Sequence, residues 1–149
     1  MPVTDAAAEM LLFFSGFLSA TLLPGSSETV LVGLLASGKS DAFTLVLVAT
    51  VGNTLGAVTN WCLGRFFERF HERKWYPISA ATLAKTRAWF NRYGVWTLLF
   101  SWIPVIGDPL TLVAGILRIG FWRFLALVAT GKALRYGFVV LAWNAWPAA

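Results

Sequence analysis

Two carboxylates and two cations lie inside otherwise apolar stretches of this chain: Glu28, Asp108, Lys132 and Arg135. Ionisable side chains in sequence that fits a bilayer are costly and are functional candidates by default. The two cations would attract a phosphate group. The two carboxylates would limit how tightly that group is held, and they could take up protons. We therefore treat these four residues as a candidate substrate-binding or ion-binding site.

Each of these residues also has a simpler structural explanation. Glu28 follows two serines, Ser26 and Ser27, either of which could cap a helix, and a carboxylate in the first turn complements the helix dipole. Asp108 precedes Pro109, which is the pattern of an N-cap followed by proline at the first helical position. The two cations, three positions apart on one helical face, could extend to the membrane surface.

The apolar stretch at residues 42–64 has no charged residue and is the clearest predicted transmembrane helix. It contains Asn53 and Asn60 at helical spacing, together with a GxxxG pair, Gly52 and Gly56. Small residues let another helix approach closely, and amide side chains hold membrane helices together. Helix packing is thus the simpler role for the asparagines, and binding of a polar ligand is the alternative.

Two other apolar runs are interrupted by a proline, then a glycine, then an acid. The first break is Pro24-Gly25 before Glu28, and the second contains Pro104 and Gly107 before Asp108. The run at residues 10–23 has 14 residues, about 21 Å as a helix, against a hydrocarbon core of about 30 Å. Each interrupted run is therefore either a kinked span or a re-entrant hairpin that enters and leaves on one side.

Composition assigns the chain to the all-α integral membrane proteins, because 58% of its 149 residues are hydrophobic and only 13% are charged. The formal net charge is +5, but the basic residues flank apolar segments, which indicates a cytoplasmic surface rather than nucleic-acid binding. The N-terminus lacks the basic region of a cleaved signal peptide. No metal-ligand cluster, GxSxG or P-loop occurs, so we predict no enzyme, cofactor or metal.

The middle of the chain is a predicted cytoplasmic basic segment, residues 65–92, which contains a short amphipathic helix. Ser79 is its predicted N-cap, and one face is predicted to carry Leu83, Thr86, Phe90 and Tyr93.

An internal repeat surrounds this segment. Residues 33–38 match residues 115–120 in pattern, and Leu-Val-Ala-Thr at 47–50 recurs at 127–130, with offsets of 82 and 80 residues. We therefore predict one membrane domain, with repeat 1 at about 9–64 and repeat 2 at about 93–146. Re-entrant hairpins would put nine basic residues in the cytoplasm and only Lys39 outside. This charge balance favours hairpins over kinked spans, and it gives the repeats inverted topology.

The order of these motifs resembles the DedA (VTT-domain, SNARE-associated) membrane proteins, in particular their small bacterial YqaA-like branch. The motifs that carry the resemblance are Pro24-Gly25 with Glu28, Gly64-Arg65-Phe66, the Pro104 hairpin running into residues 112–115, and residues 131–136. The resemblance implies two oppositely oriented re-entrant hairpins in the bacterial inner membrane. It also implies movement of lipids or lipid-linked carriers between leaflets, with protons as a candidate coupling ion. Larger members carry an arginine after the second hairpin's proline, where this chain offers only Asp108, so Lys132 or Arg135 is our candidate to replace that charge.

Two functions are therefore compared. The first is a flippase or scramblase for a phospholipid or a lipid-linked phosphate carrier, with undecaprenyl phosphate and phosphatidylethanolamine as candidate substrates. The second is a structural or assembly subunit acting through helix contacts, for which GxxxG and a homo-oligomer would matter most.

Overall fold

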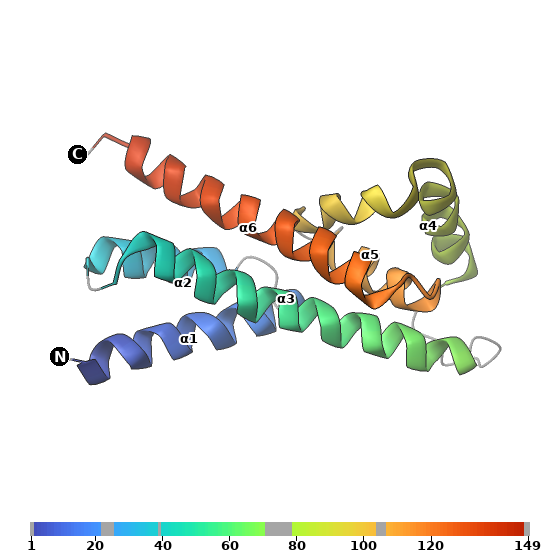
Figure 1. Cartoon of the computed structure of the whole chain (residues 1–149), viewed down its shortest axis with the longest axis horizontal. Helices are drawn as coiled ribbons and strands as arrows, with labels where there is room; N and C mark the ends of the chain where they lie inside the picture. Colours follow the sequence, from blue (N-terminus) through green and yellow to red (C-terminus); the bar gives the residue numbers. More distant parts are fainter. Residues whose placement is uncertain (1, 22–25, 39, 71–78, 104–106, 148–149) are drawn as a thin grey trace. The chain divides into compact units, whose positions relative to one another are not determined.

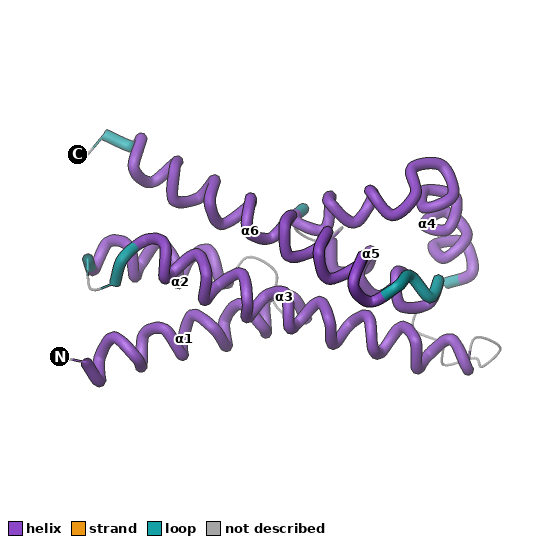
Figure 2. The backbone as a smooth tube through the Cα atoms, viewed as in Figure 1, coloured by secondary structure: helices purple, strands orange, loops and turns teal. Residues whose placement is uncertain are grey.

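The structure, a computed structural model, describes residues 2–21, 26–38, 40–70, 79–103 and 107–147. The side chains of residues 2–5, 21, 70 and 108 are not part of this description. In the described ranges the fold is all-helical. No strand occurs in these ranges, which agrees with the predicted class (Figures 1 and 2). The predicted turns at Pro24, Gly25 and Pro104 lie outside them. The elements are α1 (Pro2–Thr21), α2 (Ser26–Ser37), α3 (Ala42–Phe67), η1 (Glu68–Phe70), α4 (Ala80–Tyr93), η2 (Gly94–Trp102), α5 (Gly107–Ile116) and α6 (Phe121–Ala145).

By length and composition, α3 and α6 are the described helices that could cross a membrane, with 26 and 25 residues. α3 confirms that the stretch predicted at 42–64 is a helix, which continues three residues further, to Phe67. Its first turn is capped by Asp41, whose carboxylate accepts hydrogen bonds from the backbone N–H of Thr44 at 2.9 Å and from the Thr44 hydroxyl at 2.6 Å. These bonds hold the pKa of the Asp41 carboxyl below its ordinary value.

The chain forms two compact units, which are described separately. Unit 1 comprises Met1–Gly56 and Lys132–Ala149, and unit 2 comprises Ala57–Gly131, so the division cuts both α3 and α6. In unit 1, α1 contacts α2. The core of unit 1 draws on four helices and consists of Leu12, Leu31, Leu45, Ala49 and Tyr136.

Small residues bring α1 and α3 together in unit 1. A Cβ atom added at Gly52 would lie 2.3 Å from the Phe13 carbonyl oxygen, and one at Gly56 would lie 2.7 Å from that of Phe17. Only glycine leaves room for so close a backbone approach. The GxxxG pair therefore serves helix packing, as predicted, and its partner is a helix of the same chain.

Unit 2 uses a reciprocal pair of glycines. A Cβ at Gly64 of α3 would lie 2.1 Å from the Leu112 carbonyl oxygen, and one at Gly115 of α5 would lie 2.0 Å from the Trp61 carbonyl oxygen. Around this contact, Trp61 donates a hydrogen bond from its indole N–H to the Ile119 carbonyl at 3.1 Å. The core of unit 2 comprises Ala57, Phe90, Leu98, Leu110, Val113, Ala114, Phe124 and Val128.

The amphipathic helix predicted in the basic segment is α4, which contacts both η2 and α5. The prediction of Ser79 as N-cap is confirmed, because its hydroxyl accepts from the backbone N–H of Thr82 at 3.2 Å. Phe90 is buried, and Leu83 packs against the unit 2 core. Tyr93, the last residue of α4, is 49% exposed, and its ring lies against that of Trp89.

The interrupted runs differ in detail from their prediction. α1 begins at Pro2, eight residues before the predicted start, and its 20 residues correspond to about 30 Å. Helix length alone therefore does not exclude a crossing by α1, although its apolar part, Ala6–Ala20, is shorter. The first half of the second run is not an α-helix but the 3-10 helix η2.

The order of elements recurs along the chain, α1-α2-α3 before the basic segment and η2-α5-α6 after it. The turn before each long helix contains a left-handed residue, Gly38 with φ 63° and Arg118 with φ 56°, which are 80 positions apart. This spacing equals one of the two sequence offsets. A single membrane domain built of two repeats stays a prediction.

Replacing Gly52 by Ala is expected to destabilise the protein by about 1 to 3 kcal/mol, because the new methyl group would collide with the Phe13 carbonyl. Gly33→Ala is the matched control, since a Cβ at Gly33 in α2 would meet nothing within 4 Å. There the change should be neutral or stabilising by up to about 1 kcal/mol. Thermal unfolding in detergent measures both, and equal losses would contradict the close approach of α1 and α3.

Candidate functional site

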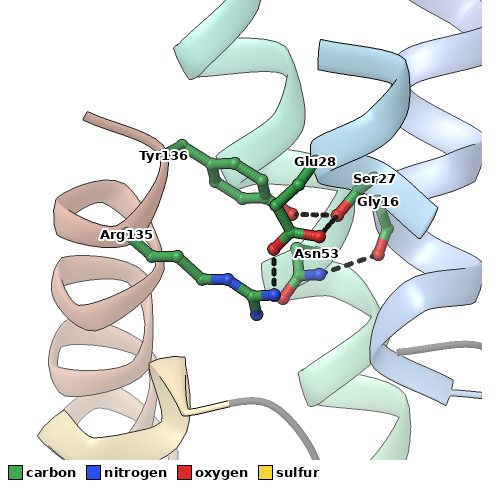
Figure 3. A network of polar contacts seen from close by, with 6 residues as sticks. All are labelled: Gly16, Ser27, Glu28, Asn53, Arg135 and Tyr136. Atoms are coloured by element: carbon green, nitrogen blue, oxygen red, sulfur yellow. Dashed lines mark hydrogen bonds and ion pairs between the residues drawn. The ribbon is translucent and has the colours of Figure 1, made fainter. Parts of the chain in front are cut away.

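Glu28 and Arg135, two of the predicted site residues, form an ion pair in unit 1. Glu28 lies in the first turn of α2 and Arg135 in the second half of α6, and Oε1 of the carboxylate meets Nη2 of the guanidinium (Figure 3). The side chains are only 21% and 13% exposed. An opposite charge at contact distance offsets much of the cost of removing each group from water. The pair thus joins two of the four ionisable residues that the sequence singled out.

Two hydroxyl groups extend the pair into a small polar network. Ser27 donates a hydrogen bond to Oε2 of Glu28 at 3.3 Å and shares another, at 2.8 Å, with the hydroxyl of Tyr136. Figure 3 shows the Glu28 carboxylate between the Arg135 guanidinium and the Ser27 hydroxyl. Both Ser27 and Tyr136 are fully buried. The network thus links α2 to α6 through one charged and one neutral contact.

Asn53 adds a contact between α3 and α1. Its side-chain N–H donates to the carbonyl oxygen of Gly16 at 3.0 Å, and its own Oδ1 has no hydrogen-bond partner among the described residues. The contact requires close backbones: a Cβ at Gly16 would lie 3.1 Å from the Asn53 backbone nitrogen. The packing role predicted for Asn53 is confirmed, and a buried acceptor remains available.

Lys132 is buried, with 1% of its surface exposed. It precedes Arg135 by three residues and Tyr136 by four, so all three lie on one face of α6. This burial argues against the simpler explanation, in which the Lys132 side chain extends to the membrane surface.

Three other predicted residues, Asn60, Gly107 and Asp108, lie in unit 2. Asn60 donates a hydrogen bond to the Thr111 hydroxyl at 3.2 Å, which joins α3 to α5 and fits the packing role. Gly107 is the first residue of α5, where a Cβ would lie 2.0 Å from the Ser101 carbonyl oxygen. The prediction of Asp108 as N-cap is wrong, because α5 begins at Gly107 and Asp108 is already its second residue. The side chain of Asp108 is outside the described part.

The N-cap predicted at Ser26 or Ser27 also needs correction, since both serines lie inside α2. Ser27 instead forms a hydrogen bond with the hydroxyl of Tyr136. Sequence reasoning missed both Tyr136 and Gly16 as site residues. Tyr136 could have been found as the residue one helical turn beyond Lys132, whereas Gly16 contributes only a backbone carbonyl, which no side-chain pattern reveals.

The network places opposite charges, two hydroxyls and an unoccupied amide acceptor in a buried, largely apolar setting. Such a site can hold a polar or charged group of a ligand by replacing one internal contact with another. No group of three metal-binding side chains occurs among the described residues.

The whole chain is similar to proteins of the bacterial inner membrane. A family model described as the VTT domain matches residues 9–144. "Inner membrane protein YqaA" of Escherichia coli strain K12 is 48% identical over 140 residues, 94% of each chain, and so is its namesake in Shigella flexneri. An uncharacterized protein of Haemophilus influenzae is 38% identical over 84% of this chain and 80% of its own. No solved structure matches. The chain therefore belongs to the VTT-domain family, as a YqaA-like protein of the bacterial inner membrane.

Proposed function

We propose that this protein moves a lipid with a phosphate headgroup between the two leaflets of the inner membrane. The observation that carries the proposal is the buried Glu28–Arg135 ion pair beside Ser27, Tyr136 and Asn53. A bilayer interior offers a headgroup nothing to bind, so a polar site within apolar helices lowers the barrier to crossing. The acyl chains would stay in hydrocarbon throughout.

The ion pair gives each charge a distinct role. The phosphate would compete with Glu28 for the Arg135 guanidinium, which can bind either oxyanion through two N–H groups. Glu28 would then displace the phosphate and release it. The free Oδ1 of Asn53 would accept a hydrogen bond from an amine or hydroxyl of the headgroup, such as that of phosphatidylethanolamine. Proton uptake by Glu28 is the candidate coupling step, and Asp108 is the candidate acid of the second hairpin.

The topology proposed with this function has two re-entrant hairpins in inverted orientation. It is supported by the recurring element order and by α1 lying against α2, as the two halves of a hairpin would. Undecaprenyl phosphate, which has one phosphate and no amine, is the second candidate substrate.

The alternative, an assembly subunit acting through GxxxG contacts, is less well supported. Gly52 and Gly56 lie against α1 of the same chain, so they are not free for a neighbouring copy. The names of the relatives give a location and no reaction.

The direct test is leaflet exchange in proteoliposomes. A fluorescent phospholipid and an impermeant quencher report how much of the lipid reaches the outer leaflet. Vesicles with the protein should exchange the lipid at least tenfold faster than protein-free vesicles. Rates equal to those of protein-free vesicles, for phosphatidylethanolamine and for undecaprenyl phosphate alike, would contradict the proposal.

Topology gives a separate prediction. With Cys62 replaced by Ser, single cysteines at Thr4 and Ser40 should react with an impermeant thiol reagent added from outside, and one at Ala84 in α4 should not. The reason is that a hairpin returns the chain to its starting side, whereas a kinked span would not. Opposite reactivity at Thr4 and Ser40 would show that the first interrupted run crosses the membrane.

A further inference from the structure

A cavity of about 480 Å³ lies in unit 2, between α4, η2 and the start of α5. Its size falls within the range of about 300 to 1,000 Å³ that is usual for sites holding small molecules. It is formed entirely by unit 2 residues, so it is distinct from the ion pair of unit 1. Trp89, Phe100, Ile103 and Leu110 supply its large apolar side chains.

Three threonines also line the cavity, and their hydroxyls already form hydrogen bonds within the protein. Thr86 donates to the Thr82 carbonyl at 2.9 Å, and Thr97 donates to that of Gly94 at 2.9 Å. The hydroxyl of Thr82 is bonded to that of Ser79 at 2.8 Å. Thr86 and Thr97 have therefore used their hydroxyl protons within the protein and have no donor to offer a ligand, so most of the cavity wall is apolar.

One charged residue lines the cavity, Lys85. No described carboxylate forms an ion pair with it. α4 also carries Arg87 and Arg92 but no acidic residue, and η2 has no charged residue at all. On α4 and η2 the charge beside this apolar cavity is therefore positive, and Asp108 in the first turn of α5 is the one acidic residue of the three elements. This excess of cations favours an anionic amphiphile.

Membrane lipid is the anionic amphiphile that this surface meets. Trp89 and Phe100 line the cavity and are 56% and 49% exposed, and Trp96 nearby on η2 is 66% exposed. Exposed tryptophans beside a cationic amphipathic helix are typical of the headgroup level of a bilayer. We infer that the cavity binds one acyl chain of an anionic phospholipid, with its phosphate on Lys85. This is a resident lipid site that fixes α4 to the membrane, and it does not depend on transport.

The test uses the full chain in proteoliposomes containing a trace of phospholipid with a photoreactive diazirine on one acyl chain. After illumination, mass spectrometry maps the labelled residues. Phosphatidylglycerol should label α4 and η2 at least fivefold more than phosphatidylcholine does. Lys85→Gln should remove that preference, while Arg87→Gln, which removes an equal charge on another side of α4, should change labelling less than twofold.

A second pair of variants tests the cavity itself. Thr86→Trp would fill it and should abolish the labelling, whereas Ala84→Trp adds the same ring on the opposite side of α4 and should leave labelling intact. Equal labelling by both lipids, or labelling that survives both Lys85→Gln and Thr86→Trp, would overturn the inference. So would displacement of the label by a free fatty acid but not by unlabelled phosphatidylglycerol. Because the experiment measures labelling and not transport, its result can contradict the lipid site without contradicting the proposed leaflet exchange.

Discussion

Replacing Glu28 by Gln is expected to lower the melting temperature of the protein in detergent by about 6 to 12 °C. The substitution leaves the Arg135 guanidinium buried without its carboxylate, and breaking a buried pair costs about 3 kcal/mol or more. For a chain of this size, each kcal/mol corresponds to about 2 to 4 °C. Differential scanning fluorimetry of the purified variants gives the comparison directly.

The two single substitutions should not be equivalent. After Arg135→Gln, the remaining carboxyl group can become neutral by taking up a proton, whereas after Glu28→Gln the guanidinium stays charged. We therefore expect Arg135→Gln to cost less than Glu28→Gln. The double variant should cost less than the sum of the two, because it leaves no unpaired charge. Strict additivity would mean that the two side chains do not interact in solution.

A second ion pair of the same chain provides the control. Arg118 donates from Nε to Oε2 of Glu68 at 2.8 Å, but its side chain is 68% exposed. The neighbouring carboxylate raises the pKa of the Arg118 guanidinium, yet exposed pairs add little to stability because water solvates the separated charges as well. Glu68→Gln and Arg118→Gln should leave the melting temperature unchanged within the scatter of the measurement.

Much of the fold could be predicted from local pattern. The long apolar run that became α3 could be predicted from length and hydropathy alone. The start of α4 could be predicted from the capping position of Ser79. The use of Gly52 and Gly56 as a packing surface followed from their spacing. In each case the deciding interaction lies within one helix or depends on the absence of a side chain, so neighbours in the sequence carry the information.

The sequence alone could not show which residue each buried side chain contacts. Ser27 fits a helix cap as well as it fits a buried contact, and only its distance to Tyr136, 109 positions away, separates the two roles. The same holds for Asn53, whose partner is a backbone carbonyl. Charge was more informative, because a buried acid requires a nearby base, and the chain offers few bases inside apolar sequence. Lys132 and Arg135 were therefore both candidate partners for Glu28, and the structure shows Arg135 in contact with it.

If the proposed function holds, the Glu28–Arg135 ion pair should also control the rate of lipid transport. Arg135→Gln is expected to slow leaflet exchange in proteoliposomes about tenfold or more, because the site loses its charged donor for the phosphate, a contact of about 1.5 to 3 kcal/mol. Glu28→Gln should slow exchange as well, but for the opposite reason. Without its competing carboxylate, Arg135 would hold the phosphate longer, and release would become the slow step.

Lipid binding separates these two causes. In detergent, phosphatidylethanolamine should bind Glu28→Gln more tightly than wild type and Arg135→Gln more weakly, although both variants exchange lipid slowly. Arg123→Gln is the matched control, since it removes a cation from the exposed start of α6 and should leave exchange and binding at wild-type levels. A common loss of binding in both site variants would assign the ion pair a purely structural role. If both variants are folded and move phosphatidylethanolamine and undecaprenyl phosphate at the wild-type rate, the pair anchors α2 to α6, and lipid crosses by another path.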